Sequence, residues 1–409
     1  MRYMRNPASI VAAAFCALAG SALTACGGDD NHGTAPRTQV LHSFGKETPV
    51  IVSPSPLVLG KDGNFYATAL GGAYNRGVIF KMTPAGVASV VHSFDPSIGD
   101  GGEPSGLILG SGGNFYGTTI SGGTNGWGTV FKMTPDGTES VLYSFKGFPS
   151  DSAWPSGVFQ ASDGNFYGTS DFGGPDNKGT VFKVSPSGIE TVLYSFGSVA
   201  NDPAGGFSAL VEGDDGNFYG VSGNGGTSNL GAVFQITPEG ILTLVHSFTG
   251  GSNDGNVGPG SGLLKGSDGN FYGIASGHGP NGGGIVYKLT PAGVETIVHA
   301  FGPSTSGVGS FPEGTLSEDP NGNLYGGTQG GGYPRTVCGN QGCSNTGSSG
   351  TIFEITAAGN AVLLSNFGPT DADGTNPSGP PIQGQDGNLY GVTTNGGAND
   401  AGVFYKITR

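Results

Sequence analysis

The 409-residue sequence contains few charged residues, and basic residues are the scarcer kind. Lys and Arg number 16 against 30 Asp and Glu, so the formal net charge is −14, and charged residues make up only 11% of the chain. Nucleic-acid backbones and anionic lipid surfaces are bound through clusters of Lys and Arg, and this sequence has no such cluster. The composition therefore argues against a nucleic-acid partner and against a polybasic membrane-binding face.

Long apolar segments are also missing beyond the N-terminus. The apolar stretch from about Ile10 to Ala19 follows Arg2 and Arg5, as in a secretory leader, and it is too short to span a bilayer. We therefore expect a signal peptide over residues 1–25 and no membrane-spanning helix.

The leader ends in the letters LTAC, which resemble the lipobox of bacterial lipoproteins. The resemblance implies that Cys26 becomes the acylated first residue of the mature chain and that residues 26–38 form the anchor and a flexible linker. An ordinary signal peptide that contains a cysteine is the alternative. Gly27 follows the cysteine, which by the same resemblance permits delivery to the outer membrane. The expected location is the bacterial cell envelope, on its periplasmic or surface side, with the lipid anchor as the only membrane attachment.

Cysteine is scarce as well, with four in the chain. Cys16 lies in the leader and Cys26 is the expected lipidation site, which leaves Cys338 and Cys343. A structural zinc site needs four ligands, and no further Cys or nearby His supplies them. In an oxidising compartment we predict instead that Cys338 and Cys343 form a disulfide that closes a small loop.

Glycine, in contrast, is abundant, with 82 residues, and aromatic residues make up 10% of the chain. Disordered glycine-rich chains lack aromatic and β-branched residues. Here Phe, Tyr, Val, Ile and Thr stand in short, evenly spaced runs. This pattern predicts an all-β fold in which glycine occupies the turns.

One tyrosine marks a repeat of about fifty residues. The spacings between its copies are 50, 51, 52, 53, 53 and 65 residues. The seven copies are Tyr66, Tyr116, Tyr167, Tyr219, Tyr272, Tyr325 and Tyr390. Repeats of this length with four short strands are typical of β-propeller blades, whereas a parallel β-helix would need about half this period. The sequence therefore predicts a seven-bladed β-propeller over residues 39–409, with four antiparallel strands in each blade.

The copy at Pro104–Phe145 shows the repeated unit most clearly. The strands predicted in it, from a to d, are 106–110, 114–119, 129–134 and 140–145. The a–b turn reads Asp-Gly-Asn in five copies, although copy six reads Asn321-Gly-Asn, and the c–d turn reads Pro-x-Gly. Both suit tight hairpins because Asp, Asn and Gly tolerate positive φ.

The two ends of the chain each supply part of one blade. Residues 39–44 match a strand d with no a, b or c before it, and residues 402–408 match a strand c with no d after it. Seven complete blades therefore require the N-terminal strand to pair into the last blade. Such closure also removes the free sheet edges that invite aggregation.

The segments DGNFYGTT, GTVFKMTP and SF resemble the GloVer tandem repeat (Gloeobacter/Verrucomicrobium type) of exported bacterial proteins. The likeness covers residues 39–409 in seven copies. It implies a propeller-like body with variable anchoring, and it brings no established activity or site residues.

The b–c and d–a connections are longer than the turns, and they fall together on one face of a propeller. Loops on a rigid scaffold carry most binding groups, so this long-loop face is the candidate functional side. Both tryptophans lie in these loops and break the repeat, Trp127 in the b–c loop of blade 2 and Trp154 in the d–a loop that follows. We expect the two indoles to be neighbours, and they are candidates for stacking on a sugar or an aromatic peptide side chain. The alternative is that they cover an apolar gap between blades.

Four aspartates precede strand a on the same face and are candidate binding residues around the channel mouth. They are Asp100, Asp151, Asp254 and Asp373. The oxygens of Asp371, Asp373 and Asn376 have a spacing that suits Ca²⁺, although the segment lacks the other ligands of a full calcium loop. Capping turns at the start of strand a explain the recurrence equally well. No other cofactor is indicated.

The histidines give little support for catalysis. One repeat position is occupied by either His or Tyr, which favours a structural role: His42, His92, Tyr143, Tyr194, His246 and His299. His278 is out of register, in the b–c loop of blade 5. We therefore expect a non-catalytic binding or scaffold module for an envelope glycan, peptide or protein partner. A polysaccharide hydrolase or lyase that works from the long-loop face is the alternative, and it would need His278 with nearby carboxylates.

Overall fold

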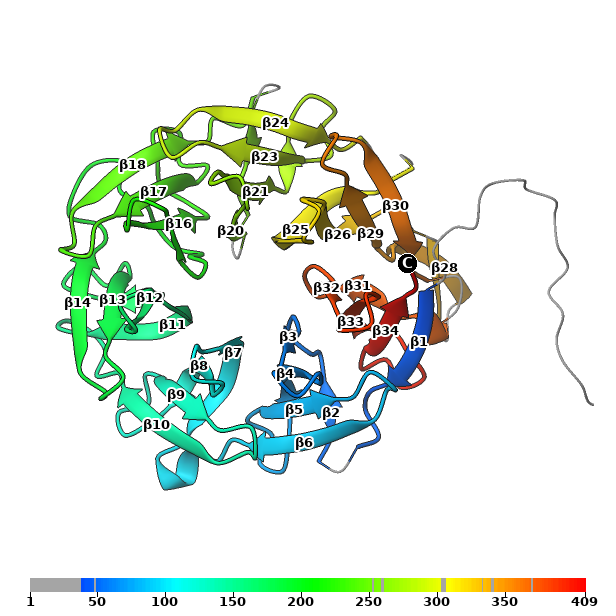
Figure 1. Cartoon of the computed structure of the whole chain (residues 1–409), viewed down its shortest axis with the longest axis horizontal. Helices are drawn as coiled ribbons and strands as arrows, with labels where there is room; N and C mark the ends of the chain where they lie inside the picture. The colour runs from blue at the N-terminus through cyan, green and yellow to red at the C-terminus, as the bar shows by residue number, and fades with distance from the viewer. Residues whose placement is uncertain are drawn as a thin grey trace, which may run out of the picture. The chain divides into compact units, whose positions relative to one another are not determined.

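Seven small antiparallel sheets stand around a central axis, as the fifty-residue period predicts (Figure 1). The computed structural model describes residues 38–409 except 48, 252–253, 259–260, 303–306, 333, 340–341 and 369–370. The expected leader, Cys26 and the linker before residue 38 lie outside the described residues. No helix among the described residues has the length and apolarity to cross a membrane.

Each blade holds four strands, with strand a innermost and strand d on the periphery (Figure 1). The strands of blades 1 to 4, from a to d, are β3 (Val58–Leu59), β4 (Phe65–Gly71), β5 (Val78–Met82), β6 (Ala88–Ser93); β7 (Gly101–Leu109), β8 (Phe115–Gly122), β9 (Thr129–Met133), β10 (Glu139–Ser144); β11 (Ser152–Gln160), β12 (Phe166–Gly173), β13 (Thr180–Val184), β14 (Glu190–Ser195); and β15 (Val211–Glu212), β16 (Phe218–Ser222), β17 (Ala232–Ile236), β18 (Leu242–Ser247). Those of blades 5 to 7 are β20 (Leu263–Lys265), β21 (Phe271–Ala275), β23 (Ile285–Leu289), β24 (Glu295–Ala300); β25 (Ser310–Glu318), β26 (Leu324–Gly330), β29 (Thr351–Ile355), β30 (Ala361–Asn366); and β32 (Ile382–Gln383), β33 (Leu389–Asn395), β34 (Val403–Ile407), β1 (Thr38–Ser43).

Further short elements lie in the long loops. They are the strands β2 (Ile51–Val52), β19 (Gly255–Asn256), β22 (Gly277–His278) and β31 (Thr375–Pro377), and the 3₁₀ turns η1 (Pro96–Ile98) and η2 (Asp371–Asp373). In blade 2 strand a starts at Gly101, five residues before the predicted 106, because Gly101–Pro104 also pair with the end of β8. The prediction missed this part because the φ of +58° at Glu103 and the bulge after Pro104 interrupt the alternation of a regular strand.

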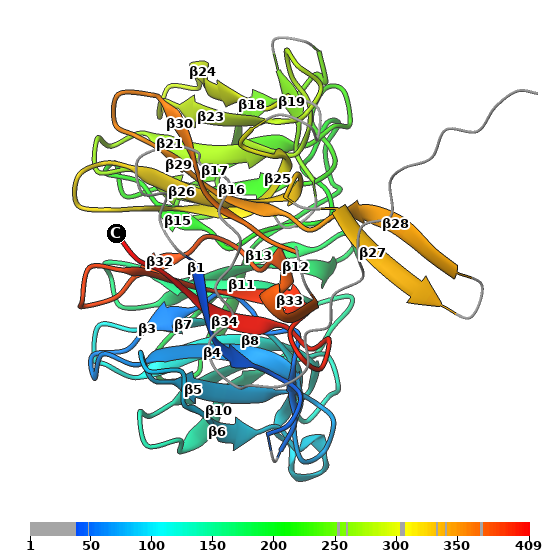
Figure 2. The same ribbon diagram turned by 90° about the vertical axis from the view of Figure 1, so that its right-hand side faces the viewer.

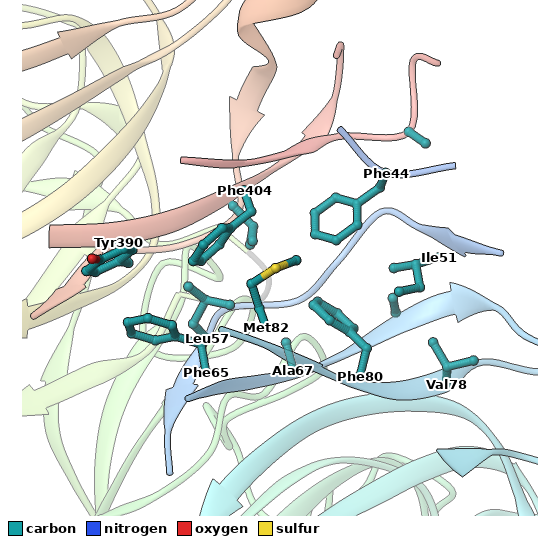
Figure 3. Packing of buried hydrophobic residues seen from close by; sticks show 13 residues of the cluster. Phe44, Ile51, Leu57, Phe65, Ala67, Val78, Phe80, Met82, Tyr390 and Phe404 are labelled. Carbon is teal, nitrogen blue, oxygen red and sulfur yellow. The ribbon is translucent and has the colours of Figure 1, made fainter. Parts of the chain in front are cut away.

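The ring closes as predicted, by strand β1 at the start of the chain. β1 pairs antiparallel with β34 at its end, from Thr38 opposite Ile407 to Ser43 opposite Val403. Phe44, directly after β1, then packs against Phe80 of blade 1 at 5.4 Å between ring centroids (Figure 3). The N-terminal strand is therefore hydrogen-bonded into blade 7 and packed against blade 1.

Aromatic contacts between neighbouring blades explain why the repeat keeps its tyrosine. The ring of Tyr167 in blade 3 packs on Phe218 of blade 4 with centroids 4.1 Å apart, and Tyr66 packs on Phe115 in the same way at 4.3 Å. At the closure Tyr390 packs on Phe65 at 4.6 Å (Figure 3). A buried aromatic ring contributes a large apolar area, and the hydroxyl of Tyr can still reach a polar partner at the edge. The tyrosine thus joins two blades.

A glycine at the start of strand c lets each blade approach the next one closely. Gly128 has a φ of +95°, and a Cβ there would lie 2.2 Å from the Thr119 carbonyl oxygen and 3.0 Å from Cδ of Pro155 in blade 3. Gly77 stands in the same relation to Pro104. Only glycine fits both the backbone angle and the contact.

Blade 6 differs from the others by a hairpin between its strands b and c. The strands β27 (Pro334–Gly339) and β28 (Gly342–Ser348) project from the ring and account for the spacing of 65 residues (Figure 2). Their register sets Cys338 opposite Cys343. Directly opposed antiparallel residues are within the Cα separation of a disulfide. The predicted disulfide is compatible with this backbone and stays a prediction.

Candidate functional site

The face that carries the short a–b and c–d turns, here the short-turn face, is built from one repeated polar group. In blade 3 Asp163 accepts hydrogen bonds from the backbone N–H of Asn165 at 2.9 Å, from its Nδ2 at 2.7 Å and from the Tyr167 hydroxyl at 2.8 Å. Burial opposes ionisation of Asp163, but these bonds outweigh it and hold its pKa below the ordinary value. The same bonds recur around Asp62, Asp215, Asp268 and Asp386.

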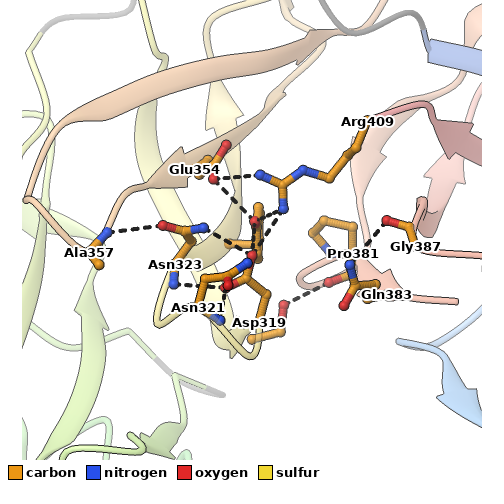
Figure 4. A network of polar contacts seen from close by, with 11 residues as sticks. Asp319, Asn321, Asn323, Glu354, Ala357, Pro381, Gln383, Gly387 and Arg409 are labelled. Carbon is orange, nitrogen blue, oxygen red and sulfur yellow. Dashed lines mark hydrogen bonds and ion pairs between the residues drawn. The ribbon is translucent and has the colours of Figure 1, made fainter. Parts of the chain in front are cut away.

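Blade 6 rebuilds this group with different residues (Figure 4). Its turn has Asn321 where five other copies have Asp and blade 2 has Gly112. The carboxylate comes from Asp319, which accepts a hydrogen bond from the Tyr325 hydroxyl at 2.8 Å. Glu354, in strand c, stands where five other copies have a lysine such as Lys288. Arg409 supplies the missing positive charge, with contacts of 3.0 Å to Asp319 and 2.8 Å to Glu354. Blade 6 therefore keeps the group although its turn lacks the aspartate.

Three of the four predicted aspartates, Asp100, Asp151 and Asp254, lie at blade junctions against outer strands and not around the channel mouth. Asp100 is buried between blades 1 and 2, where it lies 2.9 Å from Nε2 of His92 on the outer strand β6 and accepts from the N–H of Gly101 at 2.6 Å. Asp151 binds Tyr143 in the same way at 2.7 Å, and Asp254 lies 3.6 Å from His246. The carboxylates therefore cap the start of strand a, the second interpretation above, and tie it to the previous blade.

These contacts confirm the structural interpretation of the mixed His and Tyr position. In four copies the imidazole or phenol reaches the aspartate eight residues further on, and Tyr194 does so with buried Asp202 at 2.9 Å, which was not predicted. His42 instead contacts Glu47, and His299 has a glycine at that distance. Asp373 stands eight residues after Ser365 in the same register, and it is half-buried.

Three glutamates complete the junctions and were missed from the sequence. Each begins a strand d and meets the aspartate of the preceding junction: Glu139, Glu190 and Glu295. Burial, and then the neighbouring aspartate, raises the pKa of Glu139 to about 7 and that of Glu190 to about 8. The ligand atoms of His92, Asp100 and Glu139 lie within 4.8 Å of one another, a spacing that a metal ion could use.

The junction between blades 2 and 3 explains this arrangement without a metal. It keeps the carboxyl pair Asp151 and Glu190 but has Tyr143 in place of histidine. A protonated glutamate beside an aspartate is stable in such a buried place, whereas two ionised carboxylates are not. The repeated arrangement therefore holds blades together.

The long-loop face carries a group of exposed aromatic side chains at the junction of blades 2 and 3. This aromatic patch consists of Trp127, Phe148, Trp154 and Phe172, which are 42%, 54%, 44% and 39% exposed. The Trp154 N–H donates to the Trp127 carbonyl at 3.2 Å, so the two tryptophans are neighbours in the chain fold as predicted.

Each indole of the patch has its own support. Trp154 packs edge-on against Phe172 with centroids 4.9 Å apart and planes at 81°. Trp127 lies over Gly147, where a Cβ would come within 2.8 Å of the indole, and Phe148 follows directly. Phe172 and Phe148 were not predicted, although both are aromatic residues that other copies replace, Phe172 near the end of strand β12 and Phe148 in the loop after β10.

A polar pocket lies on the same face, at the next blade junction. It has a volume of about 460 Å³ at the junction of blades 3 and 4 and is lined by Lys178, Asn201, Thr227, Ser228 and Asn229 among others. Lys178 belongs to the b–c loop of blade 3, the loop that also follows Phe172. The central channel holds another cavity of about 290 Å³. Residues in strand a or just before it line this cavity, for example Ser55, Ser105 and Leu107.

Two of the remaining predicted site residues, His278 and Asn376, contact amide side chains. Nδ1 of exposed His278 lies 3.0 Å from Oδ1 of Asn256, an amide and not a carboxylate. In the calcium candidate, Asn376 donates from Nδ2 to Asn395 at 3.3 Å. The side chain of Asp371 is outside the described part of the chain.

Similar solved structures share the propeller fold at low sequence identity. Virginiamycin B lyase from Staphylococcus aureus matches with a TM-score of 0.58 at 12% identity, over 91% of this chain and 99% of that one. The extracellular domain of a hybrid two-component system from B. thetaiotaomicron gives 0.56 at 12% identity, over 91% and 41%. An oligogalacturonate lyase in complex with manganese gives 0.52 at 11% identity, over 92% and 98%. These likenesses concern the fold alone.

Sequence comparison identifies the repeat itself. No curated protein matches the sequence. The family model described as the Gloeobacter/Verrucomicrobia repeat matches residues 22–211 and 206–409. The two matches together span most of the chain, so the protein belongs to the Gloeobacter/Verrucomicrobia repeat family.

Proposed function

We propose that this propeller is an extracytoplasmic binding protein that holds a glycan against the aromatic patch of its long-loop face. The observation that carries the proposal is the patch itself: four aromatic side chains that break the repeat and stay 39–54% exposed at one junction. Exposed groups of apolar residues on a soluble surface mark binding sites, because leaving them in water without a partner has a free-energy cost.

The surroundings of the patch favour a glycan over an aromatic peptide. A sugar ring stacks its apolar C–H face on an indole and directs its hydroxyls outward. The polar pocket at the next junction, between blades 3 and 4, offers amide, hydroxyl and ammonium groups of Asn201, Thr227, Ser228 and Lys178 for such hydroxyls. An apolar peptide side chain would leave these polar groups without partners.

Affinity measurements on matched variants test the proposal. Calorimetric titration with a panel of envelope oligosaccharides is carried out on the wild type, on the double variant Trp127→Ala/Trp154→Ala and on Tyr74→Ala. Tyr74 is an exposed aromatic of the same face, 55% exposed and outside the patch, and serves as the control. The double variant is expected to lose about tenfold or more in affinity, and Tyr74→Ala to bind like the wild type. Unchanged affinity in a folded double variant would contradict the proposal.

The same glycans separate binding from catalysis. Chromatography of the mixtures after long incubation is expected to show intact chains. Cleaved products would replace the proposal with the hydrolase or lyase alternative.

The tether belongs to the same proposal. We propose that Cys26 carries the lipid that keeps the propeller at the envelope, since its LTAC context resembles a lipobox. Cys26→Ala is expected to move the protein from the membrane fraction to the soluble fraction of its bacterium. An unchanged distribution would contradict the anchor but not glycan binding.

A further inference from the structure

In six of the seven blades one residue near the start of strand a has a left-handed backbone. In five blades it precedes a proline and is not glycine: Ser53 (φ +48°), Glu103 (+58°), Trp154 (+55°), Phe311 (+53°) and Asn376 (+57°). Blade 4 has Gly206 there (+62°), and the residue of blade 5 lies outside the described part of the chain. We call this the pre-proline position.

The backbone of the pre-proline position is held by the preceding blade. The N–H of Trp154 donates to the Trp127 carbonyl at 3.2 Å, and that of Phe311 donates to the Gly283 carbonyl at 2.7 Å. The following proline fits against the glycine that begins strand c of the preceding blade, as Pro312 does beside Gly284. Neither contact involves the side chain of the pre-proline residue. The fold therefore fixes the position and leaves its side chain free to differ.

The aromatic occupants are the unexpected ones. Asn tolerates left-handed φ and is the natural residue there, as Asn376 shows in blade 7, whereas Trp and Phe are strained by about 1 kcal/mol or more. Trp154 and Phe311 nevertheless remain 44% and 45% exposed. Strain that persists at exposed side chains, in a position where the fold accepts Asn, favours a role in binding.

We propose that the pre-proline positions form one recognition set around the channel mouth, in which Trp154 and Phe311 are two separate stacking contacts. Blades 3 and 6 lie on opposite sides of the ring (Figure 1). A ligand that touches both must cross the mouth of the channel. The ligand is therefore an extended glycan chain and not a single sugar, an inference that rests on the proposed function.

The variants Trp154→Asn and Phe311→Asn test this set, with Tyr74→Asn as control. Asn removes the aromatic ring and relieves the backbone strain, so both variants are expected to keep or raise the midpoint of thermal unfolding. Trp154→Asn is expected to weaken short and long oligosaccharides alike, by about tenfold. Phe311→Asn is expected to weaken the long chains and leave the short ones unchanged, and Tyr74→Asn to bind like the wild type.

Each contrary outcome is distinct. If Phe311→Asn binds chains of every length like the wild type while Trp154→Asn does not, the recognition set is wrong and the aromatic patch stands. If both Asn variants unfold several degrees lower, the rings are structural packing and the set is wrong. If the wild type binds no glycan of any length, the proposed function fails as well.

Discussion

The two faces of the ring differ in how residues that depart from the repeat are packed and hydrogen-bonded. On the short-turn face Asp163 and its counterparts each accept three hydrogen bonds, and the altered copy in blade 6 is repaired by Asp319 and Arg409. On the long-loop face the altered copies are left as they are. Trp154 and Phe311 keep strained backbones and exposed rings. The departure of blade 6 is thus compensated by other residues of the fold, whereas the aromatic departures of the long-loop face stay exposed.

The largest expected effect is on the repaired group of blade 6. Arg409→Ala leaves the carboxylates of Asp319 and Glu354 buried without their cation, with side chains 1% and 9% exposed. Removing one partner of such a group costs about 3 kcal/mol of unfolding free energy. Chemical denaturation measures this loss. The control Lys406→Ala removes a partner of Asp386, whose side chain is 42% exposed, and is expected to cost less than about 1 kcal/mol. Equal losses in the two variants would contradict the difference between compensated burial and surface pairing.

Asp163→Ala sharpens the comparison within a single blade. It removes three hydrogen bonds and leaves the Tyr167 hydroxyl without its acceptor, at a cost of roughly 1–2 kcal/mol. Asp176→Ala, which removes an exposed aspartate from the long-loop face of the same blade, is expected to change stability by less than about 0.5 kcal/mol. The contrast between the faces fails if the two variants melt alike.

The glutamates at the blade junctions give a smaller, pH-dependent effect. Burial and Asp151 raise the pKa of Glu190 to about 8, so the folded state binds a proton that the unfolded state releases near the ordinary glutamate pKa of 4.5. Its stabilising contribution is complete below about pH 4.5 and is lost as the pH rises through about 8. Glu190→Gln stays neutral, so at pH 8 it is expected to be more stable than the wild type by on the order of 1 kcal/mol after allowance for solvent screening. Thermal unfolding between pH 5 and 8 measures this, with the exposed Glu239→Gln as control. A wild type whose stability rises over that range in parallel with the Glu190→Gln variant would contradict the assignment.

The period of the sequence was enough to predict the blade count and the closure. The seven tyrosines give seven blades, but the last blade has no strand d of its own. The strand d at the start of the chain must therefore fill that place, as the pairing of β1 with β34 shows. The exposure of Trp127 and Trp154 on one face follows from the same register.

The blade junctions could not be predicted, because they depend on twist. A Cβ at Gly137, in the c–d turn of blade 2, would lie 2.8 Å from the Val91 carbonyl oxygen in strand d of blade 1. Because the strands are twisted, the start of strand d in one blade lies beside the end of strand d in the preceding blade. Glu139 meets His92 and Asp100 only through this geometry, which sequence spacing does not contain. The left-handed φ at Trp154 is equally invisible in the sequence, since Trp seldom adopts it.

Tryptophan fluorescence tests the central claim most directly. Trp127 and Trp154 are the two tryptophans of the chain, and both belong to the aromatic patch. Titration with an extended oligosaccharide is expected to shift their emission to shorter wavelength, because a stacked sugar displaces water from the indoles, with the same midpoint as the calorimetric affinity. Calorimetric binding with unchanged tryptophan emission would contradict a site on the long-loop face.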